Sequence, residues 1–119
     1  MKILGIDDSF AVNELLDTVL NGSGHNFMYV DNGQEGLKLI RSQKFDIVLL
    51  DLTMPEFSGV DVIHALKKEN IMDKQKIIIF TALSNIKQEI KELMELGVNS
   101  YIEKPIDVDA LLEKVDSFG

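Results

Sequence analysis

The sequence predicts an α/β domain, a three-layer, doubly wound (βα)5 sandwich in which helices cover both faces of a parallel sheet. Short apolar runs alternate with longer stretches of helical periodicity along the chain, and this alternation is typical of βα units. Two of the runs, Ile47–Leu50 and Ile77–Phe80, are apolar at every position, as expected for central strands buried on both faces. The 119 residues suit one domain, and the absence of cysteine excludes disulfides and thiolate metal sites.

The first two βα units are defined by two apolar runs, each followed by a helical pattern. The strand Lys2–Ile6 precedes a helix whose N-cap is Asp8 or Ser9. The strand Phe27–Val30 precedes a short helix that follows Asn32-Gly33. Apolar residues recur in these helices at intervals of three and four: Val12, Leu15, Leu16, Val19 and Leu20 in the first, Leu37 and Ile40 in the second.

The remaining three units follow the same pattern. Their strands are Ile47–Leu50, Ile77–Phe80 and Ser100–Glu103, and Gly97 is placed to end the fourth helix. The apolar positions of the three helices are Val62, Ile63 and Leu66 in the third, Ile86, Ile90, Leu93, Met94 and Leu96 in the fourth, and Val108, Leu111, Leu112 and Val115 in the fifth.

Charge and hydropathy narrow the classes of partner. The chain carries 12 basic and 20 acidic residues, a formal net charge of -8, which opposes binding to nucleic acid or to anionic lipid. The longest apolar runs fall far short of the ~20 residues that a membrane-spanning helix needs. The acidic pair Asp7-Asp8 follows the first run too closely for a signal peptide. We therefore expect a cytoplasmic protein that does not cross a membrane.

The residues with chemical potential follow the predicted strands. Ligands of open α/β sheets collect at the carboxyl ends of the strands, where this chain places Asp7, Asp8, Asp51, Thr81 and Lys104. Each pair of carboxylates 4 Å apart repels by roughly 4 kcal/mol at an effective dielectric constant of ~20. Such a cluster needs cations, of which Lys104 supplies one. Hard oxygen ligands without histidine or cysteine favour Mg²⁺, or Mn²⁺, as the second cation.

This set of groups is suited to phosphoryl transfer. A divalent metal, a lysine and a hydroxyl that converge on one carboxylate can hold a phosphoryl unit while the carboxylate oxygen attacks phosphorus. Asp51 is the natural acceptor, because it follows a central strand and is flanked by the other groups.

The chain resembles the receiver domain of two-component response regulators, the CheY-like family. The matching segments are Ile6-Asp7-Asp8, Ile47 to Pro55 followed by Gly59, Phe80-Thr81-Ala82, and Tyr101 to Pro105. Each segment alone is a weak signal, but together they stand in the right order at the expected strand ends. The resemblance covers residues 1–119 and implies a flavodoxin-like, five-stranded sheet of order 2-1-3-4-5.

The resemblance implies a role for each site residue. Asp51 would accept a phosphoryl group from a sensor histidine kinase or a histidine phosphotransfer protein. Asp8, Asp51 and the backbone carbonyl of Thr53 would bind Mg²⁺ directly, and Asp7 would bind it mostly through a water molecule. Lys104 would pair with the phosphoryl oxygens.

The resemblance also implies a switch. Thr81 would turn its hydroxyl toward the phosphoryl group while Tyr101 moves between outward and inward rotamers. The surface that partners read would comprise the fourth helix, the strand Ser100–Glu103 and the fifth helix. The peptide bond between Lys104 and Pro105 would be cis, which is rare enough to be diagnostic.

We therefore expect one receiver domain over residues 1–119, with no output domain. Its output would be the binding of a downstream target protein, with phosphorylation and dephosphorylation at Asp51 only and no turnover of a free substrate. The sequence does not separate a diffusible messenger from a carrier in a phosphorelay, nor a monomer from a phosphorylation-dependent homodimer.

Three other functions would each need a sequence feature that this chain lacks or contradicts. A nucleotide- or flavin-binding domain would need a phosphate loop after the first strand, where this chain has Asp7-Asp8. A haloacid-dehalogenase-like phosphatase would carry a second aspartate at the position of Thr53. A pseudo-receiver would bind partners independently of phosphorylation. The complete set of Asp8, Asp51, Thr81 and Lys104 argues against this function.

The loop after Asp51 departs from the family pattern at one position, where this chain has Glu56 and the family more often has a small residue.

Overall fold

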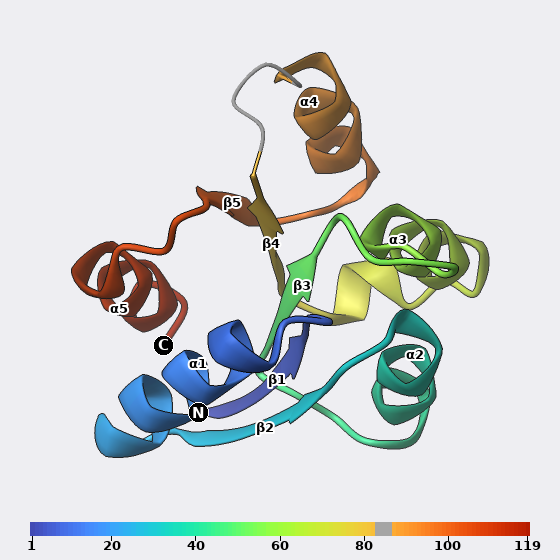
Figure 1. The fold of residues 1–119 in the computed structure, drawn as a ribbon. Coiled ribbons are helices and arrows are strands. Elements are labelled where there is room, and N and C mark those ends of the chain that lie inside the picture. Colours follow the sequence, from blue (N-terminus) through green and yellow to red (C-terminus); the bar gives the residue numbers. More distant parts are fainter. Residues whose placement is uncertain (83–86) are drawn as a thin grey trace.

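The computed structural model describes residues 1–82 and 87–119, which form the predicted three-layer sandwich (Figure 1). Five parallel strands pair in the order β2-β1-β3-β4-β5, which confirms the predicted topology. Three strands extend one residue beyond the prediction, and two of these extensions bring Asp51 and Thr81 into the sheet. The strands are β1 Lys2–Ile6, β2 Asn26–Val30, β3 Ile47–Asp51, β4 Ile77–Thr81 and β5 Ser100–Glu103.

The helices follow the strands as predicted, and side-chain caps fix where several begin. Ser9 is the N-cap of the first helix and accepts a hydrogen bond from the backbone N–H of Val12, 3.3 Å away. Ser58 and Asp61 form a capping box at the third. The helices are α1 Phe10–Gly22, α2 Gly33–Ser42, α3 Gly59–Lys68, α4 Lys87–Leu96 and α5 Val108–Asp116, with a short 3₁₀ helix, η1, at Met72–Lys74.

Three details of the helices bear on the predictions. Gly97 has a φ of +121°, which a residue with a side chain rarely adopts, and it ends α4 as predicted. The turn η1 was not predicted. Ile86, predicted as part of the fourth helix, lies outside the described residues.

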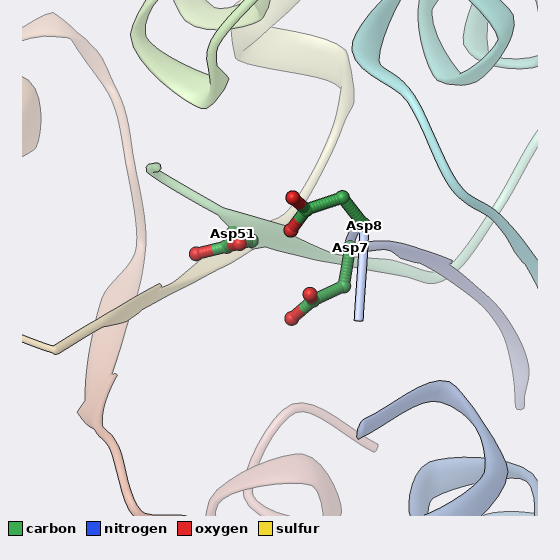
Figure 2. A group of neighbouring side chains, drawn as sticks. All are labelled: Asp7, Asp8 and Asp51. Atoms are coloured by element: carbon green, nitrogen blue, oxygen red, sulfur yellow. The ribbon is translucent and has the colours of Figure 1, made fainter. Parts of the chain in front are cut away.

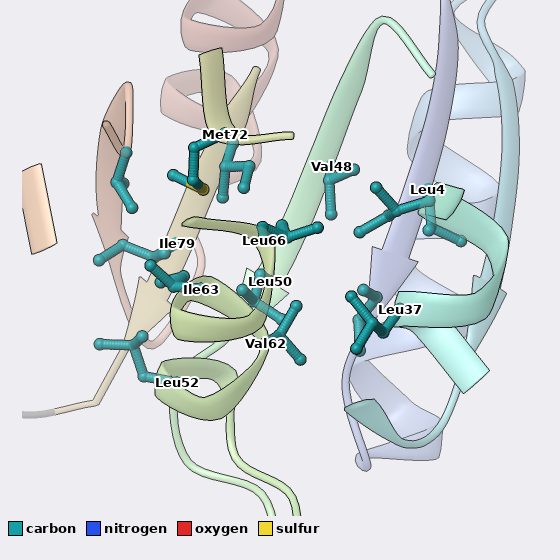
Figure 3. Packing of buried hydrophobic residues seen from close by; sticks show 14 of the residues in the cluster. Leu4, Leu37, Val48, Leu50, Leu52, Val62, Ile63, Leu66, Met72 and Ile79 are labelled. Carbon is teal, nitrogen blue, oxygen red and sulfur yellow. The ribbon is translucent and has the colours of Figure 1, made fainter. Parts of the chain in front are cut away.

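The core consists of two apolar layers, one on each face of the sheet. Figure 1 shows α1 and α5 on one face and α2, α3 and α4 on the other. Alternate residues of the central strands serve the two layers, as the period of a strand requires. Figure 3 shows the layer under α2 and α3, which includes Leu4, Leu37, Val48, Leu50, Val62, Ile63, Leu66 and Ile79. The opposite layer includes Ile3, Leu16, Leu20, Ile47, Leu49, Ile78, Phe80, Leu111 and Val115.

Two apolar residues predicted on buried helix faces lie at the surface instead. Leu15 is 38% exposed and Met94 is 36% exposed. Each lies at the margin of the apolar stripe of its helix. A spacing of three and four does not tell which of two adjacent apolar residues packs against the sheet. Among the described helices, none is long and apolar enough to cross a membrane.

Candidate functional site

Three carboxylates meet at the carboxyl end of the sheet, as the sequence predicts. Asp7 and Asp8 follow β1, and Asp51 is the last residue of β3 (Figure 2). One carboxylate oxygen from each residue lies within 4.8 Å of the others. Asp7 and Asp51 are buried, whereas Asp8 is exposed. We call Asp7, Asp8 and Asp51 the acidic cluster.

Lys104 brings one positive charge into this cluster. Its Nζ lies 2.9 Å from Oδ2 of Asp7 and 3.6 Å from Oδ1 of Asp51. The backbone N–H of Lys104 donates to the carbonyl oxygen of Thr81 at 2.7 Å, which extends the pairing of β4 with β5 to the site. The peptide bond between Lys104 and Pro105 is cis, as the family resemblance implies.

The electrostatics of the site leave negative charge unbalanced. The pKa of Asp51 is raised to about 6, first by burial and then by the neighbouring charge of Asp7, with a smaller contribution from Asp8. Lys104 and the backbone N–H of Thr53, which lies 3.3 Å from Oδ1 of Asp51, act in the opposite direction. Three carboxylates against one ammonium group leave room for a divalent cation, and the hard oxygen donors fit Mg²⁺.

The other predicted site residues lie around the cluster. Thr53 is exposed in the loop after β3, and Thr81 is buried at the end of β4. The ring of Tyr101 is at the surface, since the residue is 41% exposed. Lys114 Nζ donates to the Tyr101 carbonyl oxygen at 3.0 Å and lies 5.8 Å from the centre of its ring. The structure thus gathers the carboxylates and Lys104, with Tyr101 apart from them.

Asn13 was not predicted as part of the site. It is 1% exposed, and its Nδ2 donates to the backbone carbonyl oxygen of Asp7 at 2.8 Å. The backbone N–H of Ser9 donates to Oδ1 of Asp7 at 2.9 Å. These two bonds hold the turn between β1 and α1 and the carboxylate of Asp7. A signal was present, because Asn13 is a polar residue at the helical spacing of the buried Leu16 and Leu20.

Gly59 determines how close the loop after β3 comes to the acceptor. A Cβ at this position would contact the backbone carbonyl oxygen of Asp51 and would lie 2.8 Å from Cα of Leu52. The backbone N–H of Gly59 donates to the Leu52 carbonyl oxygen at 3.1 Å. The sequence marks Gly59 as part of a motif, but only the structure gives the physical reason for a glycine there.

Comparisons with known proteins agree with this geometry. A family model described as the response regulator receiver domain matches residues 3–116. The chain is 33% identical to the sporulation initiation phosphotransferase F of Bacillus subtilis, over 98% of this chain and 92% of that protein. It is 30% identical to the cell cycle response regulator CtrA of Brucella ovis, over 97% of this chain but only 48% of that protein.

Solved structures give the same picture. The response regulator TrrA of Thermotoga maritima, solved in complex with Mg²⁺-BeF, superimposes with a TM-score of 0.85 at 33% identity, over 100% of both chains. The chemotaxis protein CheY4 of Vibrio cholerae superimposes with a TM-score of 0.87, over 99% of this chain and 98% of that one. Its 21% identity supports the shared fold alone.

Proposed function

The chain belongs to the response regulator receiver domain family of two-component systems, and from this premise we propose that it accepts a phosphoryl group on Asp51 from a phosphohistidine of a kinase or phosphotransfer protein. The observation that carries the proposal is the meeting of the acidic cluster with Lys104 at one edge of the sheet. A carboxylate flanked by two others and an ammonium group is placed to bind a metal and a phosphoryl unit together.

Asp8, Asp51 and the backbone carbonyl of Thr53 would hold Mg²⁺, with Asp7 acting mostly through water. The bound ion would offset the negative charge that the attacking carboxylate and the phosphoryl oxygens bring together. The raised pKa of Asp51 and the oxygen-only donor set support this assignment. Binding of Mn²⁺ stays a prediction.

In the transfer step an oxygen of Asp51 attacks phosphorus, a new O–P bond forms, and the N–P bond to the donor imidazole breaks. The imidazole nitrogen leaves with the bonding electron pair and takes up a proton. Asp51 must be ionised to attack, and a pKa of about 6 leaves most molecules ionised at neutral pH. Lys104, 3.6 Å from Asp51, is near enough to pair with the incoming phosphoryl oxygens.

The phosphoryl group would then change partner binding through a switch. Added negative charge at Asp51 draws the hydroxyl of Thr81 and the ammonium of Lys104 toward it. Tyr101, whose ring lies at the surface, would move inward on the same face. The readout surface would comprise α4, β5 and α5, where a downstream target protein binds.

We further propose that these 119 residues act as a receiver domain in the cytoplasm, without turnover of a free substrate. The 33% identity to the sporulation initiation phosphotransferase F supports a role in a phosphorelay. The protein would form a phosphorylation-dependent homodimer if the readout surface also pairs with a second copy, and it would be a monomer if that surface does not.

Incubation with acetyl phosphate and Mg²⁺, followed by intact-mass measurement, tests the proposal. The parent should gain one phosphoryl group, and Asp51→Asn should gain none. Glu95→Gln, which changes an exposed carboxylate on α4, is the matched control and should gain one group. Equal labelling of parent and Asp51→Asn, or no labelling of the parent, would contradict the proposal.

A further inference from the structure

An acidic cavity adjoins the acidic cluster on the side of α1 and α2, and Asp8 belongs to both. It has a volume of about 350 Å³, within the roughly 300 to 1,000 Å³ of ligand cavities. Its walls come from the β1–α1 turn, the end of β2 and the start of α2, three segments that are neighbours in Figure 1. We call it the α1–α2 cavity; its main lining residues are Asp8, Phe10, Asn13, Tyr29, Asp31 and Glu35.

The charge of the cavity is negative and unpaired within the lining. Asp8, Asp31 and Glu35 contribute three carboxylates, of which Asp31 and Glu35 stay available when Asp8 binds Mg²⁺, and no lysine or arginine of the described residues lines the cavity. The cation nearest in the described ion pairs is Lys38, 3.5 Å from Oε1 of Glu35, and both side chains are largely exposed. An exposed ion pair of this kind has a small interaction energy. The carboxylates of the cavity therefore keep a negative potential that attracts a further cation.

Two aromatic rings stand among the carboxylates. Phe10 is 70% exposed at the start of α1, and Tyr29 is 36% exposed near the end of β2. The ring of Tyr29 stacks on the ring of Phe27 with centroids 6.1 Å apart, a contact that helps to hold its position. Aromatic faces beside carboxylates bind organic cations through the ring quadrupole, whereas they offer no ligand to a metal ion.

The wall also contains a buried acceptor. Asn13 is 1% exposed, and its Nδ2 is used by the carbonyl oxygen of Asp7. Its Oδ1 accepts no hydrogen bond from the residues that the structure describes. A buried acceptor without a donor is costly, and a small turn of the Asn13 side chain toward the cavity would let Oδ1, which has almost no accessible surface, accept from a ligand N–H group.

From these observations we propose that the α1–α2 cavity binds the guanidinium group of an arginine on a partner protein that docks beside the phosphoacceptor edge. A guanidinium is planar, stacks on aromatic rings and pairs with carboxylates through a rigid fork of N–H donors. Lysine offers a compact charge without the flat face that Phe10 and Tyr29 suit.

The exposure of Phe10 points to a protein as the source of this group. A small molecule is usually enclosed over most of its surface, yet the ring that walls this cavity is 70% exposed and free to be covered by a partner. Arginine beside an aromatic residue is also a common anchor of protein interfaces. The inference goes beyond the phosphoryl chemistry proposed above, since it needs neither Asp51 nor a phosphodonor.

A titration followed by ¹H–¹⁵N NMR tests the inference, with saturating Mg²⁺ and no phosphodonor. The probe is N-acetyl-arginine amide, and the control compound is N-acetyl-citrulline amide, a neutral analogue of nearly the same shape. The arginine compound should shift the amide signals of residues 8–13 and 29–35, and the citrulline compound should not. Equal shifts with both compounds, no shifts, or shifts confined to residues 51 and 104 would overturn the inference.

Variants and a second ligand complete the test. Phe10→Ala and Glu35→Gln should each weaken binding of the arginine compound by about two- to fivefold, as expected for exposed cation–π and ionic contacts. Asp73→Asn, which changes an exposed carboxylate of η1 outside the cavity lining, should leave binding unchanged. Free arginine, which carries backbone charges that a protein side chain lacks, should bind no more tightly than the amide. Tighter binding of free arginine would overturn the assignment to a partner protein.

Discussion

Lys104 pairs more closely with Asp7 than with the proposed phosphoacceptor Asp51: its Nζ lies 2.9 Å from Asp7 and 3.6 Å from Asp51. Asp7 is 1% exposed, so the ammonium group offsets a buried charge that water does not reach. Pairing with a phosphoryl group on Asp51 would therefore require Lys104 to share or leave a contact that it already makes. The two roles of this lysine, in the free and phosphorylated states, can be separated by experiment.

Replacing Lys104 should raise the pKa of Asp51 above about 6, because the lysine charge lowers that pKa in the parent. Lys104→Met keeps most of the apolar stem while removing the charge. The measurement is an NMR titration of the Asp51 carboxyl carbon, with Lys114→Met as the control variant. An unchanged or lower Asp51 pKa in Lys104→Met would contradict the assigned contact.

The raised pKa of Asp51 predicts how stability depends on pH. The folded protein holds this proton up to about pH 6, whereas the unfolded chain releases it near the ordinary value of 3.8. The free energy of unfolding should therefore fall as the pH rises between these values, by ~3 kcal/mol from this group. Asp51→Asn should be more stable than the parent at pH 7 and nearly equal at pH 4.

Urea unfolding of both proteins at several pH values from 4 to 7 measures this difference. If the difference in the free energy of unfolding between the parent and Asp51→Asn stays constant across this pH range, burial of Asp51 does not perturb its ionisation.

Mg²⁺ should stabilise the folded protein. At ten times its dissociation constant, an ion that binds only the folded state adds about 1.4 kcal/mol. Asp8→Ala should abolish this increment without loss of the core, since Asp8 is exposed. Thermal melts with and without Mg²⁺ give the result, and Glu95→Ala should keep the full increment. A parent melting temperature indifferent to millimolar Mg²⁺ would count against the metal site.

The sequence predicts most of the fold because the strands and helices differ in period. Central strands such as β3 are apolar from Ile47 to Leu50, and the carboxyl-end rule then brings Asp7, Asp8 and Asp51 together before any coordinates are known. What it misses depends on tertiary contact. The exposure of Leu15 and the short turn η1 follow from packing that no local pattern encodes.

Within the site, sequence reasoning identifies residue types better than their pairings. The preference of Lys104 for Asp7 depends on differences of less than 1 Å between two carboxylates. The helical spacing marks Asn13 as a buried polar residue, but it does not reveal that the side chain donates to a backbone carbonyl oxygen. Both contacts form only when α1 packs against the sheet and β5 pairs at its edge.

Gly59→Ala should destabilise the protein by about 1–3 kcal/mol, the usual cost of overpacking. The added methyl group would meet the backbone of Asp51 and Leu52, which cannot move without shifting the acceptor. Gly22→Ala is the matched control, because a Cβ there meets nothing within 4 Å. Within α1, alanine should stabilise by up to about 1 kcal/mol. Equal effects of both substitutions in urea unfolding would refute the close approach.

The central claim is that Asp51 is the residue that becomes phosphorylated. Borohydride reduces an aspartyl phosphate to homoserine, so treatment after incubation with acetyl phosphate and Mg²⁺ marks the acceptor permanently. Peptide mass spectrometry should then find homoserine at position 51 and intact aspartate at positions 7 and 8. Homoserine at position 7 or 8, or at no position in a protein that binds Mg²⁺, would contradict the account.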